Sequence, residues 1–328
     1  MLTRTTARLG RAVSVIGLGT WQLGADWGEV SEADARAVLE ASVEAGVTIF
    51  DTADVYGDGR SETIIGGYLA DHPELEIMVA TKIGRRVALD PALYTLENLR
   101  AWTDRSRANL RQDTLDLVQL HCPPTPVFSD DRVFDSLDTL VADGAIARYG
   151  VSVETAEEAL TAIARPGVAS VQIVFNAFRL KPLDAVLPAA IEAGVAIIAR
   201  VPLASGLLSG KYRNDTVFAA NDHRNYNLGG KVFDAGETFS GVDYEDGVVA
   251  AAEFVELAEA HGLTAPVAAL AWLTQLDGVT TAIPGARNIA QAQSNASAGS
   301  VAVLAPELSD QIVELYDRYF RASVHGRW

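Results

Sequence analysis

Short, continuous apolar runs recur along this chain and are separated by amphipathic segments of helical period. Eight such runs are suited to strands, and they cover residues 16–19, 47–50, 77–80, 115–120, 146–151, 170–175, 195–199 and 279–283. The runs are apolar throughout rather than alternating with polar residues, which is the pattern of parallel strands covered on both faces. The pattern therefore predicts an α/β protein with a parallel sheet.

Segments of helical periodicity with clear end signals lie between these runs. The segment 31–46 begins at Ser31, a good N-cap, carries apolar residues at helical spacing and ends at Gly46. Ahead of the first strand, residues 5–16 alternate polar and apolar positions around Gly10, which indicates a β-hairpin. Further helices are predicted at residues 61–70, 95–111, 131–142, 155–164, 183–193, 247–261 and 266–275.

Eight strand–helix units in a chain of 328 residues favour a (β/α)8 barrel over an open doubly wound sheet. No Gly-x-Gly-x-x-Gly phosphate loop follows the first strand, which also argues against the open sheet. Two extra C-terminal helices are expected at residues 288–298 and 306–319. We see no linker, so residues 1–328 are predicted to form a single TIM-barrel domain. The long segment 203–246, rich in Gly, Asn and Asp, is typical of a functional lid or a disordered loop.

Composition limits the kinds of partner. The chain is 49% hydrophobic with a formal net charge of −17, which argues against a nucleic-acid or anionic-membrane surface. Cys122 is the only cysteine, so no internal disulfide exists and a cytoplasmic location fits. No run approaches the ~20 apolar residues of a membrane span, and no basic-then-apolar leader precedes Arg8. A soluble, unexported monomer or homo-oligomer is therefore expected.

Polar residues cluster where the second apolar run ends. The stretch FDTADVY, residues 50–56, places Asp51, Asp54 and Tyr56 directly after a buried strand, and the turn residues GDGRSE follow. An Asx-type turn that closes the strand would account for this stretch structurally. In an α/β barrel, however, the carboxyl ends of the strands surround the active site, so the same residues are also typical of an active-site rim.

Two further polar residues end neighbouring apolar runs. Lys82 ends the third predicted strand, in ATK, and His121 ends the fourth, in QLH. Each has a structural alternative, because a lysine can extend its ammonium out of the barrel and a histidine can be satisfied within the core. A barrel gathers its strand ends around one mouth, so these two residues are expected to converge with Asp51 and Tyr56.

These four side chains suit proton transfer to a carbonyl oxygen. A phenol with an ordinary pKa of about 10 is a weak acid at pH 7, and the Lys82 ammonium is expected to lower the pKa of Tyr56. Asp51 would keep the lysine protonated, and His121 would orient or polarise the carbonyl. Tyr56 would then act as a general acid during hydride delivery to an aldehyde or ketone.

With these residues in place, the chain resembles the aldo-keto reductases. The resemblance rests on FDTADVY with GDGRSE, ATK, QLH, PLASGLLSGKY and IPGAR, and it extends from the N-terminal hairpin to the C-terminal helices. It implies a (β/α)8 barrel that binds NADP(H) across its mouth and acts on a small-molecule carbonyl or alcohol. It also implies a catalytic tetrad of Asp51, Tyr56, Lys82 and His121.

The resemblance further implies a set of cofactor contacts. Residues 19–21 follow the first strand near the nicotinamide, and Ser152 and Gln172 would hold its carboxamide. The phosphates would be held by the loop 202–211 and by the helix after IPGAR. The full set is Gly19, Thr20, Trp21, Asp51, Ser152, Gln172, Arg200, Pro202, Leu203, Ser205, Gly206, Leu208, Gly210, Lys211, Gly285, Ala286, Arg287, Gln291 and Asn295.

One part of this expectation is independent of the resemblance. Asn288 is a good N-cap, so the helix after IPGAR presents free backbone N–H groups and the positive end of its dipole beside Arg287. That arrangement suits the 2′-phosphate, with Gln291 behind it, and favours NADP over NAD. An exposed arginine near a helix start is the structural alternative.

Three positions depart from the pattern of many relatives. Val153 stands where many have an asparagine beside Ser152, and Ser294 where a glutamate is often found near the adenine. Arg200 stands where many stack an aromatic ring on the nicotinamide. The guanidinium plane of Arg200 would have to stack there instead.

Aromatic and basic residues are candidates for the substrate pocket. They are Trp21, Trp27, Tyr56, Arg85 and His121, with Arg86 beside them and Phe233 or Tyr226 as lids from the long segment. Aromatic rings beside a nicotinamide favour flat or apolar carbonyl faces. No metal site is predicted.

Three other functions stay open at this stage. Lys82 on a barrel strand would suit a Schiff-base lyase or aldolase. Cys122 beside His121 would form a nucleophile pair, but neighbours on a strand point to opposite faces. A catalytically weak regulatory subunit that binds NADP is the third, and the complete tetrad argues against it.

Overall fold

Eight short parallel strands form the centre of the structure, a computed structural model that describes residues 1–24, 30–220, 222–228, 230 and 236–328. Each strand pairs in parallel with its neighbours in sequence order. Parallel bridges from Ile16 to Ala282 and from Gly19 to Gly285 join the first strand to the last, so the sheet closes into a barrel. The strands are β3 (Leu18–Gly19), β4 (Ile49–Asp51), β5 (Met78–Ile83), β6 (Leu117–His121), β7 (Tyr149–Ser152), β8 (Val168–Val174), β9 (Ala196–Arg200) and β10 (Val279–Ala282).

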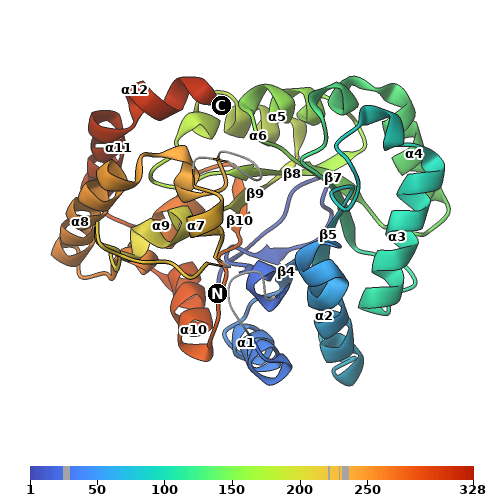
Figure 1. Cartoon of the computed structure of the whole chain (residues 1–328), viewed down its shortest axis with the longest axis horizontal. Helices are drawn as coiled ribbons and strands as arrows, with labels where there is room; N and C mark the ends of the chain where they lie inside the picture. The colour runs from blue at the N-terminus through green and yellow to red at the C-terminus, as the bar shows by residue number, and fades with distance from the viewer. Residues whose placement is uncertain (25–29, 221, 229, 231–235) are drawn as a thin grey trace.

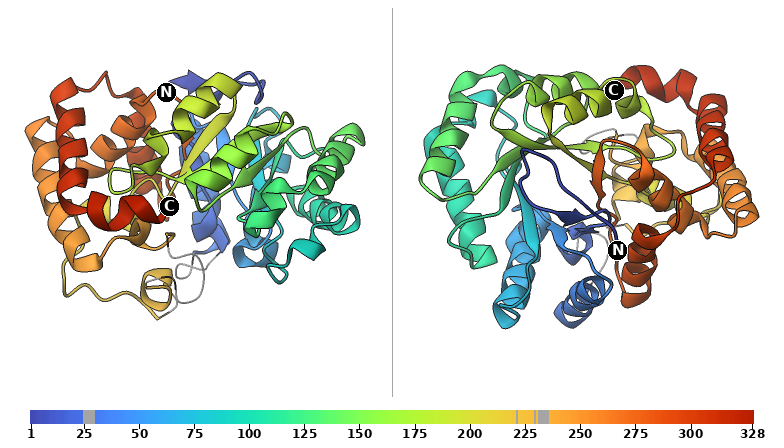
Figure 2. Two further views of the ribbon diagram at one scale, coloured as in Figure 1. Left: turned by 90° about the horizontal axis from the view of Figure 1, so that it is seen from above. Right: turned by 180° about the vertical axis from the view of Figure 1, so that it is seen from behind.

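The strands are largely apolar because both of their faces are buried. Ile49 and Met78 pack with other residues inside the barrel. Their neighbours Phe50 and Val79 face outward and belong to the larger core beneath the helices. Leu9 of the N-terminal hairpin joins the inner cluster, so the hairpin covers one end of the barrel, as the right-hand view of Figure 2 shows. This leaves the opposite end of the barrel, where the carboxyl ends of the parallel strands lie, open for a site.

Helices surround the barrel on all sides (Figure 1). Ser31 and Asn288 cap α1 and α10 as predicted, each accepting a hydrogen bond from the backbone N–H three residues later. The predicted barrel is confirmed, and so is the hairpin, as β1 (Thr3–Arg4) and β2 (Val13–Ser14). The helices are α1 (Glu32–Glu44), α2 (Arg60–Asp71), α3 (Leu96–Leu110), α4 (Asp131–Ala142), α5 (Ala156–Ile163), α6 (Val186–Ala193), α7 (His223–Tyr226), α8 (Tyr244–Ala260), α9 (Ala265–Gln275), α10 (Ile289–Ser297), α11 (Pro306–Tyr319) and α12 (Arg321–Val324).

The two predicted C-terminal helices occupy different layers. Helix α10 packs against both α1 and α9 and completes the ring around the barrel, whereas α11 packs against α8 on the outside. In the described part of the chain, no helix is both long enough and apolar enough to cross a lipid bilayer.

Polar and aromatic contacts hold parts of the long segment 203–246 that the structure describes. Arg224 forms an ion pair of 2.5 Å with Asp222, and its guanidinium lies 4.6 Å from the ring centroid of Phe218. Phe218 in turn packs edge-on against Tyr212 at 5.1 Å. Tyr226 ends α7 within the segment. The predicted lid residue Phe233 and the predicted pocket residue Trp27 lie outside the described residues.

Two adjacent glycines in α2 provide a test of the helix packing. A Cβ at Gly66 would lie 2.5 Å from the backbone oxygen of Asn109 in α3, whereas a Cβ at Gly67 would meet only the end of the Arg36 side chain, at 3.0 Å. We expect Gly66→Ala to destabilise the protein by about 1–3 kcal/mol because the helices must separate. Gly67→Ala should be neutral or stabilising by up to about 1 kcal/mol through helix propensity. Urea denaturation of both variants measures this, and equal responses would contradict the packing.

Candidate active site

Four predicted residues meet at the open end of the barrel. Asp51 ends β4, Lys82 lies near the end of the adjacent β5, and His121 ends β6. Tyr56 follows in the turn after β4. The Lys82 Nζ donates to Asp51 Oδ1 at 2.5 Å and to Tyr56 Oη at 3.3 Å, and the rings of Tyr56 and His121 lie edge to face at 6.0 Å. Neighbouring parallel strands thus bring together residues up to 70 positions apart in the sequence.

The charge of Lys82 is buried and balanced. Burial lowers the pKa of Lys82, but the negative charge of Asp51 and the hydrogen bond between them outweigh it, so the pKa is raised overall. The same ammonium donates to the backbone oxygen of Thr52 at 2.9 Å. Lys82 therefore stays protonated and fixed between a carboxylate and a phenol.

Two glutamine side chains complete the surroundings of Asp51. Its Oδ2 accepts hydrogen bonds from Gln172 at 2.7 Å and from Gln119 at 3.3 Å. We predicted that Gln172 would hold a carboxamide, and we did not predict a role for Gln119. Gln119 precedes His121 by two residues in β6, and a polar residue at that spacing in an apolar strand is the signal that could have identified it.

The net pKa shift of Tyr56 is opposite to the one expected from the sequence. Burial raises the pKa of Tyr56 above its ordinary value, and the nearby Lys82 charge only partly opposes the increase. Burial costs the phenolate more free energy than the ammonium returns. The phenol is consequently protonated at neutral pH, with an ammonium 3.3 Å away that stabilises the anion once a proton has been given up.

His121 is neutral in this site. Burial lowers its pKa well below the ordinary value, and the positive charges of Arg85, Lys82 and Arg200 lower it further. Its Nδ1 has no hydrogen-bond partner among the described residues. A neutral imidazole at the edge of Tyr56 can orient a polar substrate atom without adding charge to the mouth.

Asp54 lies behind this group rather than within it. Its backbone N–H donates to the Lys82 oxygen at 3.0 Å, and its carboxyl is buried, with Oδ1 lacking a hydrogen-bond partner among the described residues. Burial, and then the charge of the nearby Glu62, raises the pKa of Asp54 to about 7. Asp54 thus shapes the turn that presents Tyr56.

A cleft of about 700 Å³ runs from Asp51 and Tyr56 to the start of α10. Most of the predicted cofactor residues line it: Gly19, Thr20, Trp21, Asp51, Gln172, Arg200, Pro202, Leu203, Ser205, Gly206, Lys211, Gly285, Arg287, Gln291 and Asn295. Among the predicted substrate residues, Trp21 and Tyr56 line it as well.

Several predicted residues lie elsewhere. Ser152 is buried at the end of β7, where its hydroxyl contacts Cys122 Sγ at 3.4 Å, and Leu208 is buried in the core. Gly210 ends a turn and Ala286 is buried, so neither lines the cleft. His121 and Arg85 also lie outside the cleft lining.

The segment 203–246 contributes cleft residues that the sequence pattern did not identify. They are Tyr212, Thr216, Val217, Phe218, His223, Arg224 and Glu237. His223 packs on Trp21 at 5.1 Å, and Trp21 stacks on Tyr56 at 5.8 Å. Burial lowers the pKa of His223 to about 3, so it is neutral, and its Nδ1 lies 3.1 Å from Thr238 Oγ1. The segment therefore covers the mouth through an aromatic stack.

The far end of the cleft has the features of an anion site. Asn288 Oδ1 accepts from the Gln291 N–H at 2.9 Å, and Gln291 Oε1 accepts from the Arg287 N–H at 2.8 Å. Asn295 donates to the Gly285 oxygen at 3.1 Å and fixes the approach to the helix. The first-turn N–H groups of α10 have no partners within the helix, and the Arg287 side chain is exposed beside them. Within the described ranges, no group of three His, Cys, Asp or Glu side chains is placed to hold a metal ion.

A family profile, a related sequence and solved structures all match nearly the whole chain. The profile of the Aldo/keto reductase family matches residues 15–317. An uncharacterized oxidoreductase of Mycobacterium tuberculosis is 32% identical over 326 residues, covering 96% of this chain and 93% of that protein. The structure of a glycerol dehydrogenase from Gluconobacter oxydans matches with a TM-score of 0.79 and 28% identity, covering 97% of this chain and 95% of that one. An aldo-keto reductase of Klebsiella pneumoniae in complex with NADPH gives a TM-score of 0.70 and 25% identity, covering 96% of each chain.

The raised pKa of Asp54 predicts a pH-dependent stability. Between its ordinary value of 3.8 and about 7, the folded protein holds a proton that the unfolded chain has lost, so stability falls as pH rises through that window. We expect Asp54→Asn to remove this loss, so that its Tm advantage over the native protein grows from pH 5 to pH 8. Thermal denaturation across that range measures it, with the exposed Asp310→Asn as control. Identical pH slopes in all three proteins would refute the assignment.

Proposed function

The chain belongs to the aldo/keto reductase family, and on that basis we propose that it reduces small aldehydes or ketones with Tyr56 as the proton donor, or runs the reverse oxidation. It is an NADP-dependent oxidoreductase. The proposal concerns the roles of its residues and the class of its substrate.

The contact of Lys82 Nζ with both Asp51 Oδ1 and Tyr56 Oη carries this proposal. NADPH, when bound, supplies the hydride that reaches the carbonyl carbon. Tyr56 gives its phenolic proton to the carbonyl oxygen, which becomes the alcohol hydroxyl. Lys82 stabilises the phenolate left behind, and Asp51 keeps Lys82 charged. In the oxidation direction Tyr56 takes the alcohol proton back.

His121 fits a role in orienting the substrate. Its pKa is held low by burial and by neighbouring positive charges, so it meets the carbonyl oxygen as a neutral hydrogen-bonding group. A charged imidazolium there would add to the positive charges of Lys82, Arg85 and Arg200. The neutral ring leaves proton donation to Tyr56.

The cleft residues fit the cofactor. The turn at residues 204–209 carries left-handed backbone at Ser205 and Gly206, with φ of 54° and 95°, and lines the middle of the cleft. Backbone N–H groups in such turns suit phosphate oxygens. Arg287 and the first turn of α10 suit the additional 2′-phosphate of NADP(H) at the far end. An overall acidic protein thus has a local anion site.

The Schiff-base alternative is less well supported. A lysine that attacks a carbonyl must be neutral, but the Lys82 pKa is raised and its Nζ is bound to Asp51 at 2.5 Å. The Cys122 thiol contacts the Ser152 hydroxyl. This contact does not support a nucleophile pair of Cys122 with His121. A weakly active NADP-binding subunit would share the same cleft, and only turnover separates it from an enzyme.

Three earlier expectations remain predictions. We propose that residues 1–328 form one barrel domain, since one large apolar cluster extends from Val15 to Val324. Cytoplasmic location and a monomeric or homo-oligomeric state also remain predictions. A screen of aldehydes, ketones, sugars and pyridoxal that follows nicotinamide absorbance would define the substrate.

Removing the phenolic proton tests the chemistry. We expect Tyr56→Phe to lower kcat for carbonyl reduction by roughly 10²–10⁴-fold, because the change removes the proton that the proposal assigns to the carbonyl oxygen. The Kd for NADPH should stay within about twofold, since the ring remains. Stopped-flow turnover and fluorescence titration measure the two effects, with the buried Tyr68→Phe of α2 as control. Unchanged turnover in Tyr56→Phe would sink the proposal.

Removing the proposed phosphate ligand tests the cofactor site. We expect Arg287→Ala to weaken NADPH binding by roughly tenfold or more, because one charge-assisted contact to the 2′-phosphate is lost. NADH lacks that phosphate, so its binding affinity should fall by less than about twofold. Paired fluorescence titrations measure both, with the exposed Arg132→Ala of α4 as control. An equal loss for the two cofactors would place the 2′-phosphate elsewhere.

A further inference from the structure

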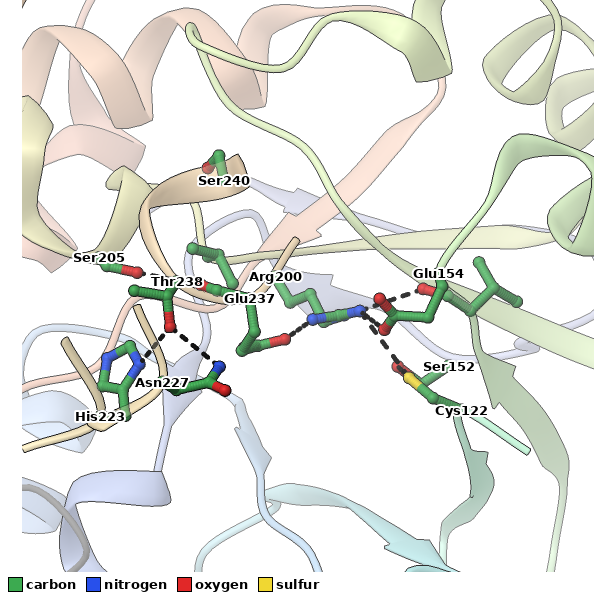
Figure 3. Close-up of polar contacts among 12 residues, drawn as sticks. Cys122, Ser152, Glu154, Arg200, Ser205, His223, Asn227, Glu237, Thr238 and Ser240 are labelled. Atoms are coloured by element: carbon green, nitrogen blue, oxygen red, sulfur yellow. Dashed lines mark hydrogen bonds and ion pairs between the residues drawn. The ribbon is translucent and has the colours of Figure 1, made fainter. Parts of the chain in front are cut away.

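Arg200, at the end of β9, is held between two carboxylates that come from different parts of the chain. Its Nη2 pairs with Glu154 Oε1 at 2.6 Å, and its Nη1 pairs with Glu237 Oε2. Figure 3 shows the guanidinium lying between the two acids. The Arg200 side chain is 8% exposed, and those of Glu154 and Glu237 are 22% and 16% exposed. The three residues form a largely buried ionic triad.

The guanidinium lies at the catalytic end of the cleft. Its Nη2 also donates to the Val153 oxygen at 3.1 Å and reaches Cys122 Sγ at 3.8 Å, so it extends over the ends of β7 and β6. Arg200 lines the cleft together with Tyr56 and Gln172. Under the proposed function, this is the end where the nicotinamide must lie to pass a hydride beside Tyr56.

The backbone from Glu237 to Ser240 is held by hydrogen bonds. Ser205 Oγ donates to the Glu237 oxygen at 3.0 Å and accepts from the Phe239 N–H at 3.0 Å. Thr238 Oγ1 lies 3.1 Å from His223 Nδ1. Ser240 Oγ accepts from Asn176 at 2.7 Å. These contacts, most of them from buried groups, hold the backbone that carries the Glu237 carboxylate.

Glu154 is fixed in a similar way. Its backbone oxygen accepts from Arg179 at 2.9 Å, and the buried Arg179 guanidinium lies 3.9 Å from the ring centroid of Trp328. The backbone N–H of Glu154 donates to Glu158 Oε2 at 2.9 Å. The backbones of both acids are therefore held by contacts other than those with Arg200.

The charges have opposite consequences for the two redox states of a nicotinamide. The reduced ring is neutral, but the oxidised ring carries a positive charge that an isolated guanidinium would repel. Within this triad, two carboxylates offset the charge of Arg200. The buried ion pair of Lys82 with Asp51 is balanced, and the Arg179 guanidinium donates to the Glu154 backbone oxygen.

We propose that Glu154 and Glu237 are positioning residues that hold the Arg200 guanidinium flat as a platform for the nicotinamide. Their two negative charges also exceed the single positive charge of Arg200 by one, so that the site accepts the oxidised ring as well as the reduced one. Arginine can stack on a flat ring in place of an aromatic side chain, but only when its plane is fixed. The inference rests on the proposed function, because it needs the nicotinamide at this end of the cleft.

Glu237→Gln and Glu154→Gln test the charge. Each change leaves the site more positive by one unit, so we expect the ratio of Kd for NADP⁺ to Kd for NADPH to rise roughly tenfold or more. Adenosine 2′,5′-bisphosphate lacks the nicotinamide, and its Kd should stay within about twofold. Isothermal titration with all three ligands measures this. Glu253→Gln on α8, which breaks the remote ion pair with Arg318 of α11, is the matched control and should change none of the three Kd values.

Glu237→Asp separates charge from shape. This variant keeps the negative charge. Its ratio of Kd for NADP⁺ to Kd for NADPH should therefore stay near that of the native protein, even if both cofactors bind more weakly. An unchanged ratio in both Gln variants would overturn the inference, and so would an equal loss for all three ligands, which indicates a purely structural role. Failure of the native protein to bind any of the three ligands would instead overturn the proposed function.

Discussion

A protonated lysine inside the mouth of a barrel must have its charge balanced by its neighbours, because desolvation of an isolated ammonium is prohibitive. Lys82 meets this constraint through Asp51 at 2.5 Å and the Thr52 oxygen at 2.9 Å. Asp51 is satisfied in turn by Gln119 and Gln172. Four adjacent side chains thus share one network, and the geometry of the catalytic end follows from the need to complete it.

The same buried network sets the acidity of Tyr56. Burial raises the phenol pKa, and the adjacent ammonium limits the increase. The phenol is therefore protonated at neutral pH, and under the proposed function the adjacent ammonium would stabilise the phenolate that proton transfer leaves. An exposed tyrosine beside an exposed lysine would gain far less, since water screens the pair.

Charge pairing also organises the segment that covers the cleft. Arg224 is fixed by Asp222 and by aromatic rings, and Arg200 is fixed by Glu154 and Glu237. In both cases a guanidinium is buried beside the cleft only because carboxylates accompany it. Arg287, which is exposed, lines the cleft beside the start of α10, where an anion is expected. An overall charge of −17 is therefore compatible with a local anion site.

The sequence by itself determined the barrel, because eight apolar runs with helical segments between them permit few other folds. It also located Asp51, Lys82 and His121, since strand ends in a barrel converge by topology, and it identified the caps Ser31 and Asn288 from local chemistry. Only the tertiary structure decided which acids flank Arg200, that both glutamines serve Asp51, and that burial outweighs Lys82 at Tyr56. Those outcomes depend on distances and desolvation across the mouth, which no local period in a sequence encodes.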